Sequence, residues 1–164
     1  MTITIEPLAA GHFGELHSVL DFVAREGRYL SFLRAPAQPQ AFAFFQGILD
    51  RGSPHCVALS FGRVVGFCDV LPTHGEARAH VGILGIGLLP EFRGQGTGAS
   101  LMTAAVARAW EKGLTRIELS VRTDNARARR LYERLGFVIE GRNRRAVCVD
   151  GQYFDSFSMA LLRS

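Results

Sequence analysis

The residues best suited to chemistry form a glycine-rich turn over residues 93–99, directly before a long amphipathic segment. Gly94, Gly96 and Gly98 let the backbone come close to a ligand, because no Cβ stands in the way. The segment that follows is expected to be a helix, whose first N–H groups and positive dipole end attract an anion. Arg93 adds a positive charge beside them. The turn therefore predicts a phosphate-binding site.

Two familiar phosphate-binding patterns do not fit this turn. A P-loop ends in Gly-Lys-Ser/Thr, whereas Gly98-Ala99-Ser100 has no lysine. The spacing G-x-G-x-x-A that ends at Ala99 satisfies the loose dinucleotide-binding pattern, and Glu118 falls roughly where a ribose-binding acid would be sought. In that fold, however, the turn follows its strand directly and opens a nucleotide-binding domain. Here residues 90–93 intervene, and too few residues follow for the remaining strands and helices.

A third pattern, Arg93-x-x-Gly96-x-Gly98, resembles the acetyl-CoA pyrophosphate loop of the GNAT superfamily of N-acetyltransferases. The downstream half also resembles this superfamily, in Glu-Leu-Ser-Val-Arg-Thr-Asp-Asn at 118–125, Ala-Arg-Arg-Leu-Tyr at 128–132 and Leu-Gly-Phe at 135–137. The resemblance covers about residues 55–162. It implies an α+β fold, a mostly antiparallel mixed sheet flanked by helices, with a splayed central pair of parallel strands.

The resemblance implies acetyl-CoA as co-substrate, held mainly by the backbone. Free N–H groups of residues 93–99 would take the pyrophosphate, and the strand edge at 86–88 would pair with the amide-bearing pantetheine arm. Glycines at 82, 85 and 87 in that strand also suggest a closely approaching ligand. The implied cofactor-binding residues are Ile86, Gly87, Leu88, Arg93, Gly94, Gln95, Gly96, Thr97, Gly98, Ala99 and Asn125, the last of which is also expected to cap a helix.

Tyr132 matches the general acid of this family, whose hydroxyl lies near the thioester sulfur. A thiol has a pKa of about 8.5 and a phenol one of about 10. Tyrosine therefore stays protonated at neutral pH and can donate its proton as negative charge grows on sulfur. The three cysteines match no nucleophile motif, which favours direct attack by the amine without a covalent enzyme intermediate.

The general base is where the chain departs from the family. Many relatives carry glutamate at the position of Ser120, and a serine hydroxyl cannot take over that role at neutral pH. Glu118, on the same strand face, and His80 are the candidates. Asp69 and Asp155 are further groups able to relay a proton through water. An enzyme without a strong general base is better suited to an α-amine, with a pKa of about 7.7–8.0, than to a lysine amine, with a pKa of about 10.4. More of the α-amine is already neutral at pH 7.

The closing segment, residues 136–159, looks most like the branch that acetylates free L-amino acids or amino-acid-like toxins. Arg142, Arg144 and Arg145 make this end basic, which disfavours polycationic acceptors. The sequence thus predicts an N-acetyltransferase that moves an acetyl group from acetyl-CoA to a primary amine, that of a free L-amino acid first of all. Two alternatives stay open: a protein N-terminal acetyltransferase of the ribosomal-protein type, and a non-catalytic acyl-CoA-binding sensor.

Composition indicates one domain over residues 1–164, since the chain has no linker-like run and is long enough to bury about two thirds of its unfolded surface. No apolar run approaches the roughly 20 residues that span a bilayer, and the first residues lack a basic region. A cytoplasmic protein is therefore expected. The net charge of +4 suits a polyanionic cofactor, because the arginines lack the interleaved aromatic residues typical of nucleic-acid binding.

Cys56, Cys68 and Cys148 are too widely spaced for a disulfide framework or a zinc site, so buried thiols and no metal are expected. The expected partner is a small-molecule amine, with no nucleic acid and no membrane, and a homodimer stays open. Periodicity predicts helices at 13–25 and 40–49, from the turn to near Gly113, and between Asn125 and Gly136. Strands are expected at 2–6, 55–61, 64–71, 80–89, 116–121, 137–140, about 145–149 and 154–162, with a two-residue turn at Gly62-Arg63 and another at Asp150-Gly151.

Overall fold

The computed structural model of the protein describes residues 2–164. Its strands form one seven-stranded sheet in the order β1-β2-β3-β4-β5-β7-β6. The strands are β1 (Ile3–Pro7), β2 (His55–Ser60), β3 (Arg63–Pro72), β4 (Val81–Leu88), β5 (Arg116–Arg122), β6 (Val138–Val149) and β7 (Gln152–Leu162). The helices are α1 (Phe13–Arg25), α2 (Gln38–Arg51), α3 (Thr97–Glu111) and α4 (Ala126–Arg134), with short 3-10 turns at Ala10–His12, Glu76–Arg78 and Pro90–Phe92.

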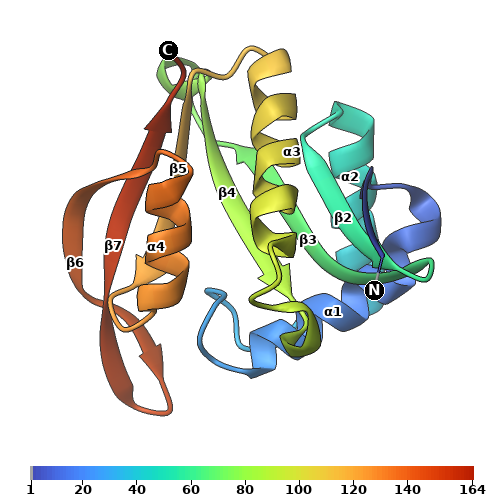
Figure 1. Cartoon of the computed structure of the whole chain (residues 1–164), viewed down its shortest axis with the longest axis horizontal. Coiled ribbons are helices and arrows are strands. Elements are labelled where there is room, and N and C mark those ends of the chain that lie inside the picture. Colours follow the sequence, from blue (N-terminus) through green and yellow to red (C-terminus); the bar gives the residue numbers. More distant parts are fainter. Residues whose placement is uncertain (1) are drawn as a thin grey trace.

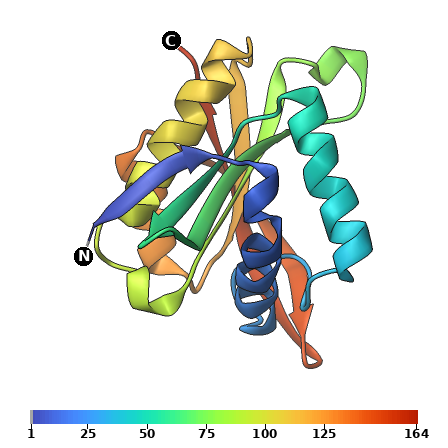
Figure 2. The same cartoon turned by 90° about the vertical axis from the view of Figure 1, so that its right-hand side faces the viewer.

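Helices cover both faces of this sheet, with α3 on one side and α1 and α2 on the other (Figures 1 and 2). Two cores result. One joins α3 and α4 to the sheet and includes Leu101, Met102 and Ile117, all fully buried. The other packs α1 and α2 against β2 and β3, with Leu16 and Ile48 at its centre. The apolar residues that recur at helical spacing in the sequence are those that the cores bury.

The central strands β4 and β5 run parallel, whereas the other neighbouring strands of the described sheet pair antiparallel. Val81, Gly82 and Ile83 lie opposite residues 116–118, and the pairing ends there. Beyond Ile83 the two strands diverge, which Figure 1 shows between β4 and β5. The expected α+β fold with a splayed parallel pair is confirmed.

The C-terminal hairpin differs from the sequence-based expectation. Residues 138–149 form one strand, β6, instead of two short strands at 137–140 and about 145–149. The register against β7 shifts between Ile139 and Gly141 and again between Asn143 and Val147. Such bulges carry extra residues out of the ladder while the pairing continues on either side. The Asp150-Gly151 turn is where the sequence placed it.

Smaller corrections concern turns, one helix start and one cysteine. The β2–β3 turn is formed by Phe61 and Gly62, with φ of 51° and 78°, one residue earlier than expected. Helix α2 begins at Gln38 because proline at 39 is tolerated in a first helical turn. Cys148 is exposed on the edge strand β6, whereas Cys56 and Cys68 are buried as expected.

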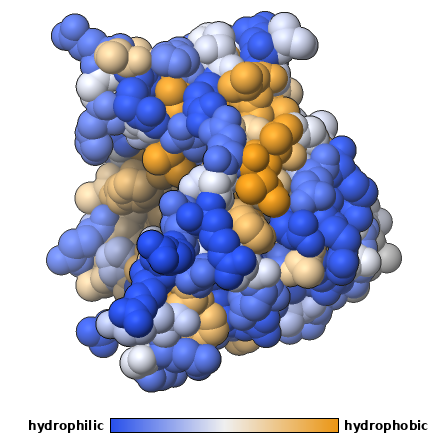
Figure 3. All heavy atoms as spheres, turned by 90° about the vertical axis from the view of Figure 1, so that its left-hand side faces the viewer, coloured by the Kyte–Doolittle hydropathy of each residue, from blue (hydrophilic) through white to orange (hydrophobic). Residues whose placement is uncertain are grey.

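The β6 edge also exposes apolar side chains. Val138 is 64% exposed, and Ile139 and Leu162 are exposed beside it. Figure 3 shows the face on this side of the molecule, where hydrophobic areas lie between hydrophilic side chains. None of the helices described over residues 2–164 has the length and apolar character needed to cross a bilayer.

Candidate active site

A cavity of about 990 Å³ opens where β4 and β5 separate. Its walls come from both faces of the sheet. Gly98 and Tyr132 line it on the α3–α4 side, and Phe45 and Phe67 line it on the α1–α2 side. One continuous space therefore reaches from the glycine-rich turn, through the gap in the sheet, to the wall made by α1 and α2. A concave, largely apolar space with a few polar groups is the usual form of a small-molecule site.

The glycine-rich turn presents a row of free backbone donors to this cavity. Gly94 and Gly96 have φ of 73° and 84°, a left-handed conformation that favours glycine. The first helical bond of α3 runs from the Ser100 N–H to the Gly96 carbonyl at 3.1 Å. Across the described chain, none of the N–H groups of residues 94–99 donates to a backbone carbonyl. These donors, at the N-terminus of a 15-residue helix, fit a pyrophosphate.

Arg93 has a different place from the one expected. Its backbone N–H donates to the Pro90 carbonyl at 3.2 Å, so the free donors begin at Gly94. Its guanidinium donates to both carboxylate oxygens of Glu26, at 2.6 and 3.0 Å, and to the Leu88 carbonyl at 2.9 Å. The charge that the sequence assigned to phosphate is therefore neutralised by an acid at the end of α1. Arg93 fastens the turn to that helix.

Uncompensated positive charge comes instead from α4. The Arg127 guanidinium lies over Gly94, where any Cβ would collide with it. Arg127, Arg130 and Arg134 line the cavity, and none of them forms an ion pair with another described residue. Arg129, by contrast, points elsewhere and pairs with Glu133 at 3.1 Å. The phosphate end of the cavity is thus bordered by cations that are free to meet an anionic ligand.

The open edge of β4 provides the second set of backbone groups. The Leu89 N–H donates to the Val65 carbonyl at 2.9 Å, which fixes the ladder so that odd-numbered residues of β4 pair with β3. Ile86 therefore directs its N–H and C=O groups toward β5, beyond the point where the two strands pair. An extended ligand with amide groups fits this edge as an added strand.

The glycines of β4 are explained by neighbouring side chains rather than by a ligand. A Cβ at Gly87 would stand 2.6 Å from the ring of Phe67, and one at Gly85 would stand 3.1 Å from Oδ1 of Asp69. The strand therefore has glycine where the larger side chains of β3 lie across it. The sequence showed that something comes close at these positions, and the structure identifies it as the protein itself.

Asn125 and Tyr132 both reach the cavity from α4 and its N-cap. The Asn125 side-chain oxygen accepts from the Ala128 N–H at 3.2 Å, as expected of a cap, which leaves its amide N–H₂ for another partner. Tyr132 is 8% exposed. Burial first, and then the nearby Cys68 thiol, raise the pKa of its phenol well above the ordinary value. The hydroxyl therefore keeps its proton at neutral pH and can donate it.

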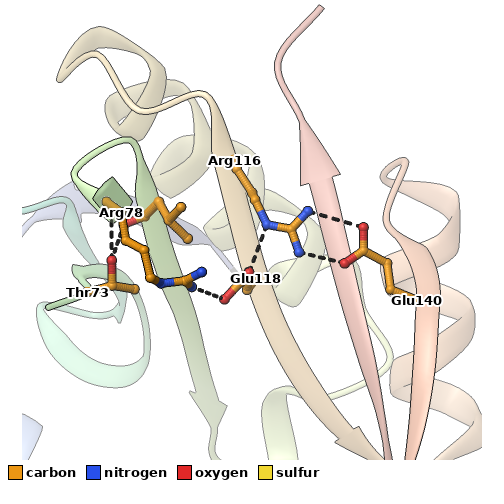
Figure 4. Close-up of polar contacts among 6 residues, drawn as sticks. Thr73, Arg78, Arg116, Glu118 and Glu140 are labelled. Atoms are coloured by element: carbon orange, nitrogen blue, oxygen red, sulfur yellow. Dashed lines mark hydrogen bonds and ion pairs between the residues drawn. The ribbon is translucent and has the colours of Figure 1, made fainter. Parts of the chain in front are cut away.

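Glu118 lies at the paired end of β4 and β5 and does not line the cavity (Figure 4). Its carboxylate accepts from Arg116 Nε at 2.7 Å and from Arg78 at 2.8 Å, and Arg116 also binds Glu140. Burial acts to raise the pKa of Glu118, but the two arginines outweigh it and lower that pKa. A carboxylate held in this way is a poor proton acceptor at neutral pH.

His80 is also outside the cavity. It is exposed in the turn before β4, where its carbonyl accepts from the N–H groups of Thr115 and Arg116. Asp155 is bound by the Arg142 side chain and the Arg145 N–H, both at 2.9 Å, on the exposed hairpin of β6 and β7. Of the acidic and imidazole groups named from the sequence, Asp69 alone lines the cavity, together with His55, to which the sequence gave no role.

Over residues 2–164, no group of three or more His, Cys, Asp or Glu side chains is placed to hold a metal ion. The sequence profile of the Acetyltransferase (GNAT) family matches residues 18–137, which include the turn, both splayed strands and Tyr132. The chain belongs to the GNAT family. It is accordingly an acetyl-CoA-dependent N-acetyltransferase, and the free donors of residues 94–99 and the open edge of β4 fit that co-substrate.

Individual GNAT relatives agree with this assignment. The chain is 30% identical to the L-amino acid N-acetyltransferase AaaT of Escherichia coli (strain K12), over 82% of this chain and 84% of the relative. A phosphinothricin acetyltransferase from Sinorhizobium meliloti in complex with AcCoA has a TM-score of 0.92 at 22% identity, over 99% of this chain and 89% of that one. A ribosomal-protein-alanine N-acetyltransferase from Brucella melitensis has a TM-score of 0.92 at 19% identity, over 98% and 99% of the two chains. These two structures share the GNAT fold.

Proposed function

We propose that this GNAT enzyme acetylates the α-amine of a free L-amino acid, or of an amino-acid-like small molecule, by direct attack. The observation that carries the proposal is the similarity to the Escherichia coli L-amino acid N-acetyltransferase, which extends over more than four fifths of both chains. A ribosomal-protein-type acceptor, the N-terminal α-amine of a protein, is the alternative that the GNAT fold equally allows.

The α1–α2 side of the cavity supports a small acceptor. Phe32, Phe44 and Phe45 line it with apolar surface suited to a side chain. Arg28 lines the same cavity and forms no ion pair with another described residue, so it is available to a carboxylate. A free amino acid carries the three matching parts, an amine, a carboxylate and a side chain, whereas a protein N-terminus lacks the carboxylate.

Each remaining group has a role in this proposal. The N–H groups of residues 94–99 hold the pyrophosphate of acetyl-CoA, and Ile86 pairs with the pantetheine amides. The free amide of Asn125 contacts the same arm. Tyr132 donates its proton to the sulfur that leaves. Glu118 and His80 receive no proton-transfer role, because the first is held by two arginines and both lie outside the cavity.

The test is thiol release from acetyl-CoA across a panel of free L-amino acids, the matching amino-acid amides, short peptides with free N-termini, and polyamines. Turnover of one class of free amino acids, with kcat/KM at least tenfold above that of its amide, supports the proposal. Arg28→Ala should abolish this preference for the free acid, because the guanidinium that recognises the carboxylate is gone.

Preference for peptides over free amino acids would replace the proposed acceptor with a protein N-terminus. If no amine in the panel is turned over while acetyl-CoA still raises the melting temperature, the enzyme acts outside the panel's acceptor classes and the proposal is wrong. Arg51→Ala, at the exposed end of α2 away from the cavity, is the matched control for the loss of one arginine.

A further inference from the structure

Asp69 is a carboxylate that lines the cavity and has no role in the acetyl transfer as described above. It stands on β3 directly opposite Gly85 of β4, and its Oδ1 lies over that glycine. Phe67 and Leu71, two residues to either side on the same face of β3, pack in the α1–α2 core. Asp69 therefore faces the acceptor side of the cavity, and its side chain keeps 13% of its exposure.

Gly85 makes Asp69 accessible to the gap in the sheet. Because glycine has no side chain, nothing on β4 stands between Asp69 and the space that β5 has left. Extending the β4–β5 register by two residues from Ile83 and Glu118 brings Gly85 level with Ser120. Ser120 is exposed and lines the cavity. Asp69 and Ser120 thus border the gap on the same face, one from each side.

Among residues 2–164, no cation neutralises Asp69. His55 pairs with it across β2 and β3, with Nε2 3.6 Å from Oδ2, and the ring is 3% exposed. Burial first, and then the charges of Arg108 and His12, lower the pKa of His55 to about 4, so the imidazole is neutral at pH 7. The cavity residues that α1 and α2 contribute nearby are apolar: Leu16, Leu20, Val23 and Phe45.

Asp69 therefore differs from the exposed carboxylates that form ion pairs with arginine, because no such pair offsets its negative charge. Burial raises the pKa of Asp69 to about 7, against a smaller opposite effect of the Gly85 N–H. Cys68 precedes it in the chain but points to the other face, where its thiol is buried and its pKa is raised. A carboxylate that titrates near neutral pH is well matched to proton transfer from an α-amine.

We propose that Asp69 is the general base of the acetyl transfer, replacing the glutamate that many relatives carry at the position of Ser120. This role rests on the proposed function. The amine nitrogen forms a bond to the thioester carbonyl carbon, and one N–H proton passes to the Asp69 carboxylate. The C–S bond then breaks with its electron pair on sulfur, and the Tyr132 hydroxyl gives sulfur a proton. Solvent in the cavity takes the proton from Asp69 and restores that of Tyr132.

The two proton-transfer groups then lie on opposite faces of one sheet. Tyr132 packs in the α3–α4 core beside Cys68, and Asp69 is the next residue of β3, facing the α1–α2 side. The acceptor and acetyl-CoA accordingly enter from different sides and meet at the gap. Deprotonation of the amine and protonation of the sulfur are kept apart by the strand pair itself.

The test is Asp69→Asn, assayed with the best acceptor from the panel as a function of pH. The wild-type kcat/KM should rise with pH through an apparent pKa near 7, because Asp69 must be ionised to accept a proton. The variant should lose about 100-fold or more in kcat at pH 7 and lose this limb of the profile. Its melting temperature and its affinity for acetyl-CoA should match those of the wild type.

A second variant separates catalysis from structure. Ser120→Glu in the Asp69→Asn background puts a carboxylate back at the gap from the β5 side, and should recover at least tenfold of the lost activity. A purely structural role for Asp69 would not be rescued in this way. Asp50→Asn, which removes an exposed carboxylate from α2, is the matched control and should retain wild-type activity.

Full activity and an unchanged pH profile in Asp69→Asn would overturn the role of Asp69 and leave the proposed function standing. A loss that the added glutamate does not rescue, accompanied by a lower melting temperature, would show that Asp69 only supports the fold. A wild-type enzyme that acetylates no amine would instead remove the proposed function, and this role with it.

Discussion

The two halves of the β4–β5 strand pair differ in almost every respect. At the paired end, Arg78, Glu118, Arg116 and Glu140 form a continuous row of ion pairs that joins the 3-10 turn Glu76–Arg78, β5 and β6 (Figure 4). At the open end, the strands have separated and the walls are largely apolar. The acid that borders the gap, Asp69, has no cationic partner in the part of the chain that the structure describes. The same pair of strands is therefore held together by ion pairs at one end and borders the candidate active site at the other.

The comparison shows that the pKa of a carboxylate in this sheet depends more on the groups around it than on its position in the sheet. Glu118 and Asp69 both lie near the middle of the sheet. Two arginines hold Glu118 ionised and shield it, whereas burial beside a neutral imidazole brings the pKa of Asp69 to about 7. Variants at the two ends should accordingly fail in different ways, the open end in catalysis and the paired end in stability.

The largest effect outside Asp69 is expected at Tyr132. Tyr132→Phe removes the donor for the leaving sulfur, and kcat should fall about 100-fold at pH 7. The ring keeps its place in the α3–α4 core, so the melting temperature should change little. Stopped assays of thiol release measure kcat, and thermal unfolding measures the melting temperature. An unchanged kcat would remove the assignment of Tyr132 as the acid.

A smaller effect at the open end is expected at Arg127. Its guanidinium lies over Gly94 without an acidic partner, so Arg127→Ala should lose a charge-assisted contact to phosphate. The KM for acetyl-CoA should rise about tenfold while kcat stays within about twofold. Arg129→Ala is the control, because Arg129 lies on another face of α4 and already pairs with Glu133. Equal effects of the two variants would argue against a specific phosphate contact.

At the paired end, Glu118→Gln should affect stability and leave catalysis unchanged. Its folded pKa lies below the ordinary value of 4.5, so the ion pairs stabilise the fold above that value and are lost as the pH falls through the folded pKa. The variant should lose about 1 kcal/mol of unfolding free energy at pH 7, and the difference from wild type should shrink in acid. Denaturant unfolding at several pH values measures it.

The effect of Glu118→Gln on kcat/KM tests directly whether Glu118 transfers a proton. If kcat/KM of Glu118→Gln stays within about twofold of the wild type across pH 6–9, proton transfer by Glu118 is excluded. A large loss of kcat without loss of stability would show that Glu118, at the paired end, acts in catalysis.

Much of the fold could be predicted because its signals are local. The helical spacing of Leu101, Met102 and Ala105, and the glycine turn before them, lie within one short segment. The merged strand β6 could not, because its bulges are set by where β7 pairs with it. The exposure of Cys148 has the same cause, since edge position is a property of the whole sheet.

The candidate site likewise has features that local sequence signals predict and features that depend on residues far away in the chain. The free backbone donors could be predicted from the residue types and spacing over 93–99, since the first N–H groups of a helix have no partner within it; in the structure they begin at Gly94. The neutralisation of Arg93 depends on Glu26, 67 residues away in the chain, and that of Glu118 depends on Arg78, 40 residues away. No local pattern contains such partners. Asp69 was one of several acids in the sequence until the register placed it across from Gly85.

The open edge of β4 has one more consequence. Unpaired strand edges on a protein surface invite other chains to pair with them and so promote aggregation. Here the unpaired groups of Ile86 lie inside the molecule, enclosed by α4, the glycine-rich turn and residues 27–32. Because these groups are enclosed, they do not form an exposed edge of the kind with which a neighbouring chain pairs. The fold thus hides this hydrogen-bonding capacity from other proteins and leaves it for the proposed contact with acetyl-CoA.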